Sequence, residues 1–138
     1  MTTIKELSNL NGRRALITGA TGNLGKVMAD TLAELGADLI LVDRPGSDFD
    51  SLSANLSNRW KVKVECQVCD LEQQAQRREL IDFLKSGEKG LNILINNAAF
   101  VGSSDLQGWS VPFEDQTLET WRRALEVNLT AVFDLCQG

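Results

Sequence analysis

The 138-residue sequence contains no histidine and no tyrosine. Histidine is the usual general base near neutral pH and the commonest metal ligand, so other side chains would have to fill both roles. Acid–base chemistry would need lysine, cysteine or a carboxyl group with a strongly shifted pKa. A zinc site could use only three cysteines and carboxylates, which is an unusual set of ligands, and we predict no metal site.

Long apolar runs and an excess of basic residues are missing as well. No segment approaches the roughly 20 apolar residues that span a bilayer, and the start of the chain lacks the apolar run of a secretory signal. Fourteen basic residues against 19 acidic ones give a net charge of −5, which argues against nucleic-acid or membrane partners. Three cysteines without an export signal are typical of reduced thiols, so we expect a cytoplasmic protein.

Patterns typical of strands and helices alternate along the chain. Three apolar runs and one alternating segment predict strands at 15–17, 39–42, 62–68 and 91–95. Helical periodicity predicts helices at 24–35, 48–59, 71–86 and from 118, with Thr117 as N-cap, to the end. The alternating third strand should lie at a sheet edge. This order of βαβ units predicts an α/β fold, a Rossmann-type doubly wound parallel sheet that forms one domain over residues 1–138.

A glycine-rich segment joins the first predicted strand to the first predicted helix, and it reads Thr-Gly-Ala-Thr-Gly-Asn-Leu-Gly from Thr18. Its glycines allow a tight turn, the close approach of a pyrophosphate and close helix–strand packing, and the helix N-terminus offers free N–H groups to phosphates. No Gly-Lys-Ser/Thr follows, which disfavours a P-loop. We predict a dinucleotide site, with an ordinary βα turn as the alternative, formed by Gly19, Thr21, Gly22, Asn23, Leu24 and Gly25.

Asp43 lies at the end of the second predicted strand, 18 residues after Gly25. A carboxylate at this position can accept hydrogen bonds from both ribose hydroxyls of an adenosine, and it repels a 2′-phosphate. Asp43 therefore favours NAD over NADP as the cofactor. Arg44 gives the opposite signal, because a guanidinium can bind that phosphate. The alternative role for Asp43 is that of a turn former at a strand end.

With these motifs the chain resembles the short-chain dehydrogenase/reductase family over essentially its whole length. The resemblance is seen in four motifs in family order: Thr18-Gly19, Asp70-Leu71, Asn96-Asn97-Ala98-Ala99 and Asn128-Leu129-Thr130. It implies that Asp70 and Leu71 lie at the adenine ring, that Asn97 and Ala98 lie at the cofactor, and that Asn128 holds a water in the active site. It also implies an NAD(P)-dependent oxidoreductase that transfers hydride between nicotinamide and a small alcohol or carbonyl substrate.

Asn128 lies within a predicted apolar stripe of the last helix, since residues recur there in steps of three and four, at Leu118, Trp121, Leu125, Asn128, Val132 and Leu135. A buried amide without partners is costly, so Asn128 should be either a satisfied structural residue or a functional one. In the family this helix commonly packs against its copy in another subunit. The stripe therefore implies a homo-oligomer, a dimer or a tetramer, with packing against the chain's own sheet as the alternative.

The sequence also departs from the family pattern. Asn23 and Ala99 stand where glycines are usual, and the loop at 98–116 is roughly seven residues longer than usual. Members with such a loop act in bacterial sugar and flagellin modification, which hints at a sugar derivative as substrate. The family's Ser and Tyr-x-x-x-Lys do not occur after Asn128. The resemblance thus implies the cofactor-binding part of an enzyme, inactive as given. The alternatives are a catalytically inactive dinucleotide-binding module and, from Gly22, an extended-branch epimerase.

Two further patterns receive structural interpretations. Cys66 and Cys69 spell C-x-x-C, but on a strand they would point to opposite faces about 10 Å apart, which is too far for a disulfide. The segment 73–79 is predicted to be a charged helix face, and Arg77 and Arg78 are given no other role.

Overall fold

The computed structural model describes residues 2–87, 90–101 and 107–138. Residues 88–89, between the predicted helix 71–86 and the predicted strand 91–95, and residues 102–106 of the predicted long loop therefore lie outside the described residues. Within the described ranges the strands are β1 (Arg14–Thr18), β2 (Asp38–Asp43), β3 (Val64–Val68) and β4 (Ile93–Ile95). They form one parallel sheet in the order β3-β2-β1-β4. The predicted doubly wound sheet is confirmed, and so is the position of β3 at an edge.

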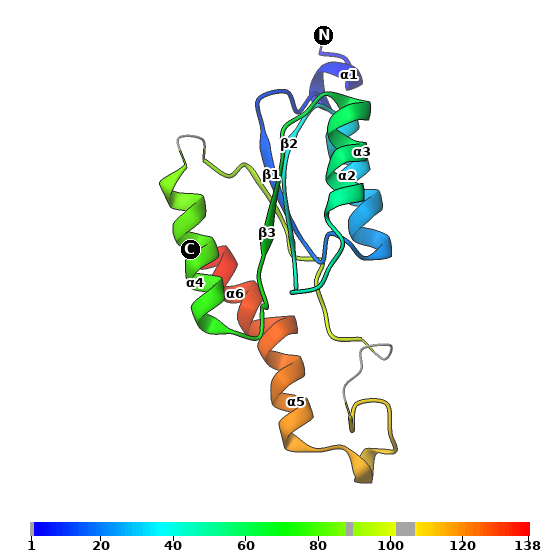
Figure 1. The fold of residues 1–138 in the computed structure, drawn as a ribbon, viewed down its shortest axis with the longest axis vertical. Helices are drawn as coiled ribbons and strands as arrows, with labels where there is room; N and C mark the ends of the chain where they lie inside the picture. The colour runs from blue at the N-terminus through cyan, green and yellow to red at the C-terminus, as the bar shows by residue number, and fades with distance from the viewer. Residues whose placement is uncertain (1, 88–89, 102–106) are drawn as a thin grey trace.

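Helices cover both faces of this sheet (Figure 1). One face carries α2 (Asn23–Glu34) and α3 (Asp50–Trp60), and the other carries α4 (Gln74–Ser86) and α6 (Ala131–Gln137). The helix α5 (Leu118–Leu125) extends past the carboxyl ends of the strands and follows a short 3-10 turn, η1 (Phe113–Asp115). None of the helices in the described part of the chain is long and apolar enough to cross a membrane.

The short helix α1 (Ile4–Leu7) precedes β1 and has no counterpart among the predicted elements. Its N-terminus is closed by a capping box, in which the Thr3 side chain accepts a hydrogen bond from Glu6 N and the Glu6 carboxylate accepts one from Thr3 N. Such a box satisfies two backbone donors that would otherwise lack partners. With only four residues, α1 was too short to be recognised from apolar periodicity.

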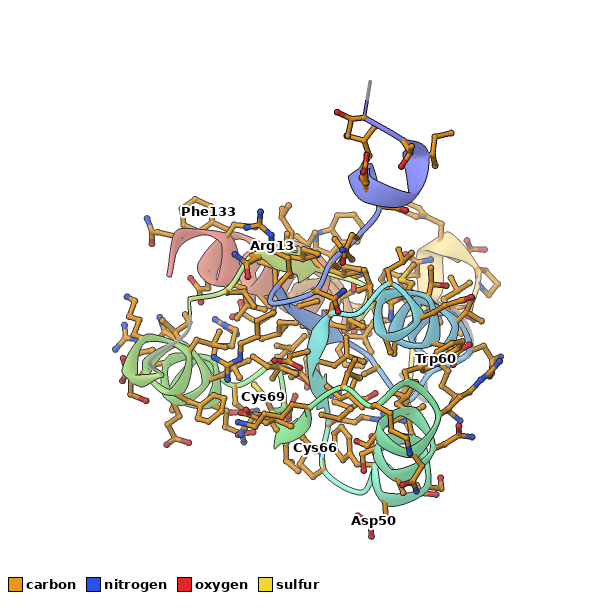
Figure 2. All side chains as sticks on the ribbon, turned by 90° about the horizontal axis from the view of Figure 1, so that it is seen from above. Arg13, Asp50, Trp60, Cys66, Cys69 and Phe133 are labelled. Carbon is orange, nitrogen blue, oxygen red and sulfur yellow. The ribbon has the colours of Figure 1, made fainter. Side chains whose placement is uncertain are left out.

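Two cores form because side chains alternate along the strands. Ala15 and Ile17 of β1 point toward the side of α2, whereas Leu16 points toward the side of α4 and α6, and all three are fully buried. On the α2 side the helix contributes mostly alanines, so it lies close to the sheet. Trp60, between α2 and α3 in Figure 2, donates from its indole nitrogen to the Asp30 carboxylate at 2.7 Å and joins these two helices.

The segment after α5 differs most from the prediction of one continuous helix. A π-helical turn, η2 (Glu126–Thr130), separates α5 from α6, and Ala131 N donates to Glu126 O. A π turn holds one residue more than an α turn. The buried residues are the mostly small Thr120, Ala124, Val127, Ala131 and Leu135.

The predicted stripe faces outward over most of its length, since Leu118, Trp121, Leu125 and Asn128 are exposed and Leu135 is buried. Leu129 and Phe133, the large apolar residues beside Asn128, are 63% and 62% exposed. These continue an outward-facing row that begins at Leu118, Trp121 and Leu125. Phe133 lies on the outer side of α6 in Figure 2.

Candidate functional site

A cavity of about 520 Å³ lies at the carboxyl ends of the strands. Its wall is built from the glycine-rich loop after β1, the end of β2, the turn after β3, the segment after β4, and Val127 of the π turn. The loops after β1 and β4 meet there, and these are the neighbouring strands at which the strand order reverses. Open α/β sheets bind their ligands at such a switch point.

Most of the residues predicted from the sequence lie in the wall of this one cavity. They are Gly19, Thr21, Gly22, Asn23, Leu24, Asp43, Arg44, Asp70, Leu71, Asn97 and Ala98. Gly25 and Asn128 do not line it. Gly25 lies beneath the glycine-rich loop, and Asn128 contacts Phe100, which is a wall residue.

Glycine is required at two positions of the loop. Gly19 has a φ of +64°, and a Cβ there would lie 2.9 Å from the Ala98 Cα. A Cβ on Gly25 would overlap the Gly19 carbonyl oxygen and lie 2.8 Å from the Ala20 Cα, so α2 can approach the loop only without a side chain. No side chain caps the N-terminus of α2 at Gly22. The first N–H groups of this helix are therefore left for a ligand.

A pair of side chains joins the loop to the end of β4. The Thr18 hydroxyl accepts hydrogen bonds from Asn97 N at 3.1 Å and Ala98 N at 3.0 Å. In return the Asn97 side-chain amide donates to Thr18 O at 2.9 Å and to Gly19 O at 3.0 Å. Thr18 was not among the predicted site residues, although it begins the Thr18-Gly19 motif. Its role could have been found only by knowing that β1 and β4 are neighbours.

The Asp43 carboxylate is oriented by the glycine-rich loop. Its Oδ2 accepts hydrogen bonds from Thr21 N at 2.9 Å and from the Thr21 hydroxyl at 2.7 Å, and its Oδ1 accepts one from Arg44 N at 2.9 Å. A carboxylate offers about four acceptor positions, so one remains for a ligand. A second ligand hydroxyl could bind only if the Thr21 hydroxyl turned away.

Asp70 and Cys69 form the part of the wall that follows β3. Asp70 N donates to the Gln76 side chain at 2.7 Å, and the Asp70 carboxylate accepts from Glu72 N at 3.0 Å. This turn explains why α4 begins at Gln74 and not at the predicted Leu71. Burial, with a smaller effect of Asp70, raises the pKa of the Cys69 thiol from 9.0 to about 11, so the thiol is protonated at neutral pH. All three cysteines are free.

Asn128 lies in the π turn and binds the backbone that follows β4. Its Oδ1 accepts a hydrogen bond from Phe100 N at 2.7 Å, and its Nδ2 donates to Phe100 O at 3.1 Å. Its partners are thus backbone groups at the edge of the cavity, and not an apolar core. A side-chain amide that pairs with both backbone groups of one residue fixes that residue's position.

Arg77 lies on the predicted charged face of α4, but it has a structural role that the sequence did not indicate. Its side chain is 1% exposed and donates to Asp134, Glu126 and the Leu71 carbonyl oxygen. Burial acts to lower the pKa of Arg77, but the hydrogen bonds to Asp134 and Glu126 outweigh it and raise the pKa above its ordinary value. Arg78, its neighbour, is exposed.

Comparison with known families gives a match over residues 13–138 to the model described as short chain dehydrogenase. Galactitol 2-dehydrogenase from Rhizobium johnstonii is 34% identical over 124 residues, which are 90% of this chain and 45% of that protein. The chain spans about half the length of the curated relatives and solved structures described here.

Two solved structures have the same fold as this chain and a sequence identity to it similar to that of the galactitol 2-dehydrogenase. A short-chain dehydrogenase from Sphingobium yanoikuyae in complex with NADPH has a TM-score of 0.78 and 33% identity, covering 91% of this chain and 46% of that one. A short-chain type dehydrogenase/reductase from Mycobacterium marinum has a TM-score of 0.83 and 29% identity, covering 99% of this chain and 52% of that one.

Proposed function

Because this chain belongs to the short-chain dehydrogenase family, we propose that it forms the dinucleotide-binding domain, residues 1–138, of an NAD(P)-dependent oxidoreductase. The observation that supports this most is the 520 Å³ cavity, in which the glycine-rich loop, Asp43 and the Asp70 turn share one wall. When bound, the dinucleotide supplies hydride exchange with an alcohol or carbonyl group. The residues of this chain bind and orient it.

Each part of the cavity suits one part of a dinucleotide. The pyrophosphate would lie against Gly19, Gly22 and the N–H groups of Asn23 and Leu24, where the absence of side chains allows close approach and the helix dipole favours negative charge. The adenosine ribose would bind the carboxylate at the end of β2. The adenine would lie toward Asp70 and Leu71, and the nicotinamide end toward Asn97 and Ala98, next to Phe100.

Our preferred cofactor is NAD, on the charge of Asp43. A 2′-phosphate at that position would be repelled by a carboxylate. Arg44 also lines the cavity, and the Sphingobium relative holds NADPH, so both observations favour NADP instead. The affinities of Asp43 variants for NAD⁺ and NADP⁺ test this preference.

We further propose that Asn128 belongs to the active site and holds a water there. The chain contains no tyrosine and no histidine, so the tyrosine that the family resemblance assigns to proton transfer would have to lie outside these 138 residues. The same absence favours the second candidate, a dinucleotide-binding module without catalysis. An assay of hydride transfer from an alcohol such as galactitol to NAD⁺, made with the protein of the complete reading frame, separates the two, since the module would bind the dinucleotide and show no turnover.

The substrate class that we propose is a small alcohol or carbonyl compound, such as a sugar alcohol. The galactitol 2-dehydrogenase relative is named for a compound of that kind. Free cysteines, including the exposed Cys66 and Cys136, agree with a reducing compartment, and we propose the cytoplasm.

We propose that the outward row on α5, η2 and α6 is the contact between subunits of a homo-oligomer. It consists of Leu118, Trp121, Leu125, Leu129 and Phe133, all large and exposed. An apolar row of this length on a helix is typical of an interface.

Trp121→Glu together with Leu129→Glu should then convert an oligomer into monomers, because two charges would be buried at the contact. The measurement is molar mass by light scattering after gel filtration. Leu7→Glu, which changes an exposed apolar residue of α1, is the control and should leave the mass unchanged. A wild-type monomer, or a double variant of unchanged mass, would contradict the proposal.

Titration calorimetry with NAD⁺ and NADP⁺ tests the proposed function itself. We expect one saturable site per chain for at least one of the two dinucleotides. Guanosine triphosphate is the control nucleotide, because the loop lacks the Lys-Ser/Thr of a P-loop. If neither dinucleotide binds, the proposed function is wrong.

A further inference from the structure

Arg77 joins three segments that meet behind the cavity. Its Nε donates to Asp134 of α6 at 2.7 Å, its Nη2 to Glu126 of the π turn at 2.7 Å, and its Nη1 to the Leu71 carbonyl oxygen at 2.6 Å. The side chain is 1% exposed, whereas the two carboxylate side chains are 34% and 25% exposed. A buried guanidinium whose three nitrogens all donate hydrogen bonds holds its partners in a defined geometry.

The spacing of Glu126 and Asp134 in the sequence shows how the π turn affects their binding to Arg77. Glu126 and Asp134 are eight positions apart in the sequence. In a regular α-helix, residues at that spacing point about 80° apart around the axis. A π turn takes up one extra residue, so the later residue moves back to within roughly 20° of the earlier one. The π turn therefore brings the two carboxylates closer to one line along the helix, where a single guanidinium binds both.

The π turn also decides where Asn128 points. Asn128 lies between the two carboxylates in the sequence, and its side chain bonds both backbone groups of Phe100. If η2 became a regular helix, the residues on one side of Asn128 would turn by about 100° relative to the other side. Either Asn128 or the buried Ala131 and Leu135 would then leave their present contacts.

We propose that Arg77 is a positioning residue for Asn128: its ion pairs with Glu126 and Asp134 hold the π turn, and the π turn directs Asn128 at Phe100 on the cavity wall. The functional meaning of this role rests on the proposed function, in which Asn128 belongs to the active site. The structural part does not need a dinucleotide. It can therefore be measured separately.

The test uses the backbone amide of Phe100, which donates to Asn128 Oδ1. In Arg77→Met we expect its resonance to shift and its hydrogen exchange to become roughly tenfold faster, the change that the loss of one hydrogen bond produces. The amide of Ile17 in β1 should keep its exchange rate, which shows that the sheet is intact. Arg78→Met is the matched control, an exposed arginine one position along α4, and should leave the Phe100 amide unchanged.

Arg77→Met leaves the two carboxylates without a cation between them and can therefore fail to fold. A second variant covers that case. The triple variant Arg77→Met, Glu126→Gln, Asp134→Asn removes the charges together and should recover a cooperative unfolding transition. Its Phe100 amide should still exchange faster than in the wild type. A Phe100 amide that stays protected in either folded variant would overturn the proposal.

Dinucleotide titration of the same samples separates this proposal from the proposed function. If the wild type binds neither NAD⁺ nor NADP⁺ while the Phe100 amide responds to Arg77 as described, the function fails and the positioning role stands. If the wild type binds a dinucleotide and the Phe100 amide does not respond to Arg77→Met, the proposed function stands and the positioning role of Arg77 fails.

Discussion

Gly25→Ala is expected to destabilise the protein and to remove most of its affinity for a dinucleotide. The new Cβ would overlap the Gly19 carbonyl oxygen and lie 2.8 Å from the Ala20 Cα, both of which are backbone atoms that cannot rotate away. Overpacking of this kind costs about 1–3 kcal/mol, and more where backbone must move. Alanine gains about 1 kcal/mol of helix propensity over glycine, which is too little to offset the collision.

The loop must shift to relieve this contact, and the shift displaces the N–H groups that face the cavity. If the same 1–3 kcal/mol is lost from binding, Kd rises roughly ten- to hundredfold. Calorimetric titration and thermal unfolding measure the two effects. Gly90→Ala is the control, because among the described residues nothing lies within 4 Å of a Cβ there. Gly22→Ala should be intermediate, with a Cβ 3.3 Å from Gly19 O. Equal behaviour of the Gly25 and Gly90 variants would contradict the placement of the loop.

Asp43→Ala is expected to weaken NAD⁺ binding far more than NADP⁺ binding. The carboxylate would accept hydrogen bonds from the ribose of NAD⁺, and a hydrogen bond to a charged group contributes about 1.5–3 kcal/mol, or roughly ten- to hundredfold in Kd. For NADP⁺ the loss is offset, since the repulsion between carboxylate and 2′-phosphate disappears and Arg44 remains. The ratio of the two dissociation constants should therefore move toward NADP⁺.

Asp43→Asn is the matched control for the loop. The Asn side chain keeps an oxygen that can accept from Thr21, as Asp43 Oδ2 does now, but it carries no charge. We expect Asp43→Asn to improve NADP⁺ binding at a small cost in thermal stability, because its Nδ2 group cannot accept the hydrogen bond that Asp43 Oδ1 accepts from Arg44 N. An unchanged ratio of NAD⁺ to NADP⁺ affinity in both variants would show that Asp43 does not meet the ribose.

The sheet and the cavity wall could be predicted because their signals are local. The apolar runs at 15–17 and 39–42 are buried on both faces, which makes them continuous in the sequence. The glycine-rich loop and Asp43 follow those runs directly. Once the strands are parallel, their carboxyl ends meet, so the residues after them share one cavity.

The π turn and the role of Arg77 could not be predicted in the same way. A period of three and four assumes a regular helix, so it gave no sign of the π turn. It also finds an apolar helix face without showing what that face contacts, and the predicted stripe is exposed from Leu118 onward. Arg77 sits among charged residues of α4 and is buried only because Glu126 and Asp134 lie opposite it. These partners are about 50 residues away in sequence, a separation that no local pattern spans. The Thr18–Asn97 contact was missed for the same reason.

The location of a bound dinucleotide tests the central claim most directly. Backbone amide resonances should be recorded while NAD⁺ is added to the protein. We expect the largest shifts at Thr21, Asn23, Asp43 and Asp70, with little change at Arg14 and Lys63, which lie at the amino ends of the strands. Shifts centred on the amino ends of the strands, or spread evenly over the chain, would contradict this claim.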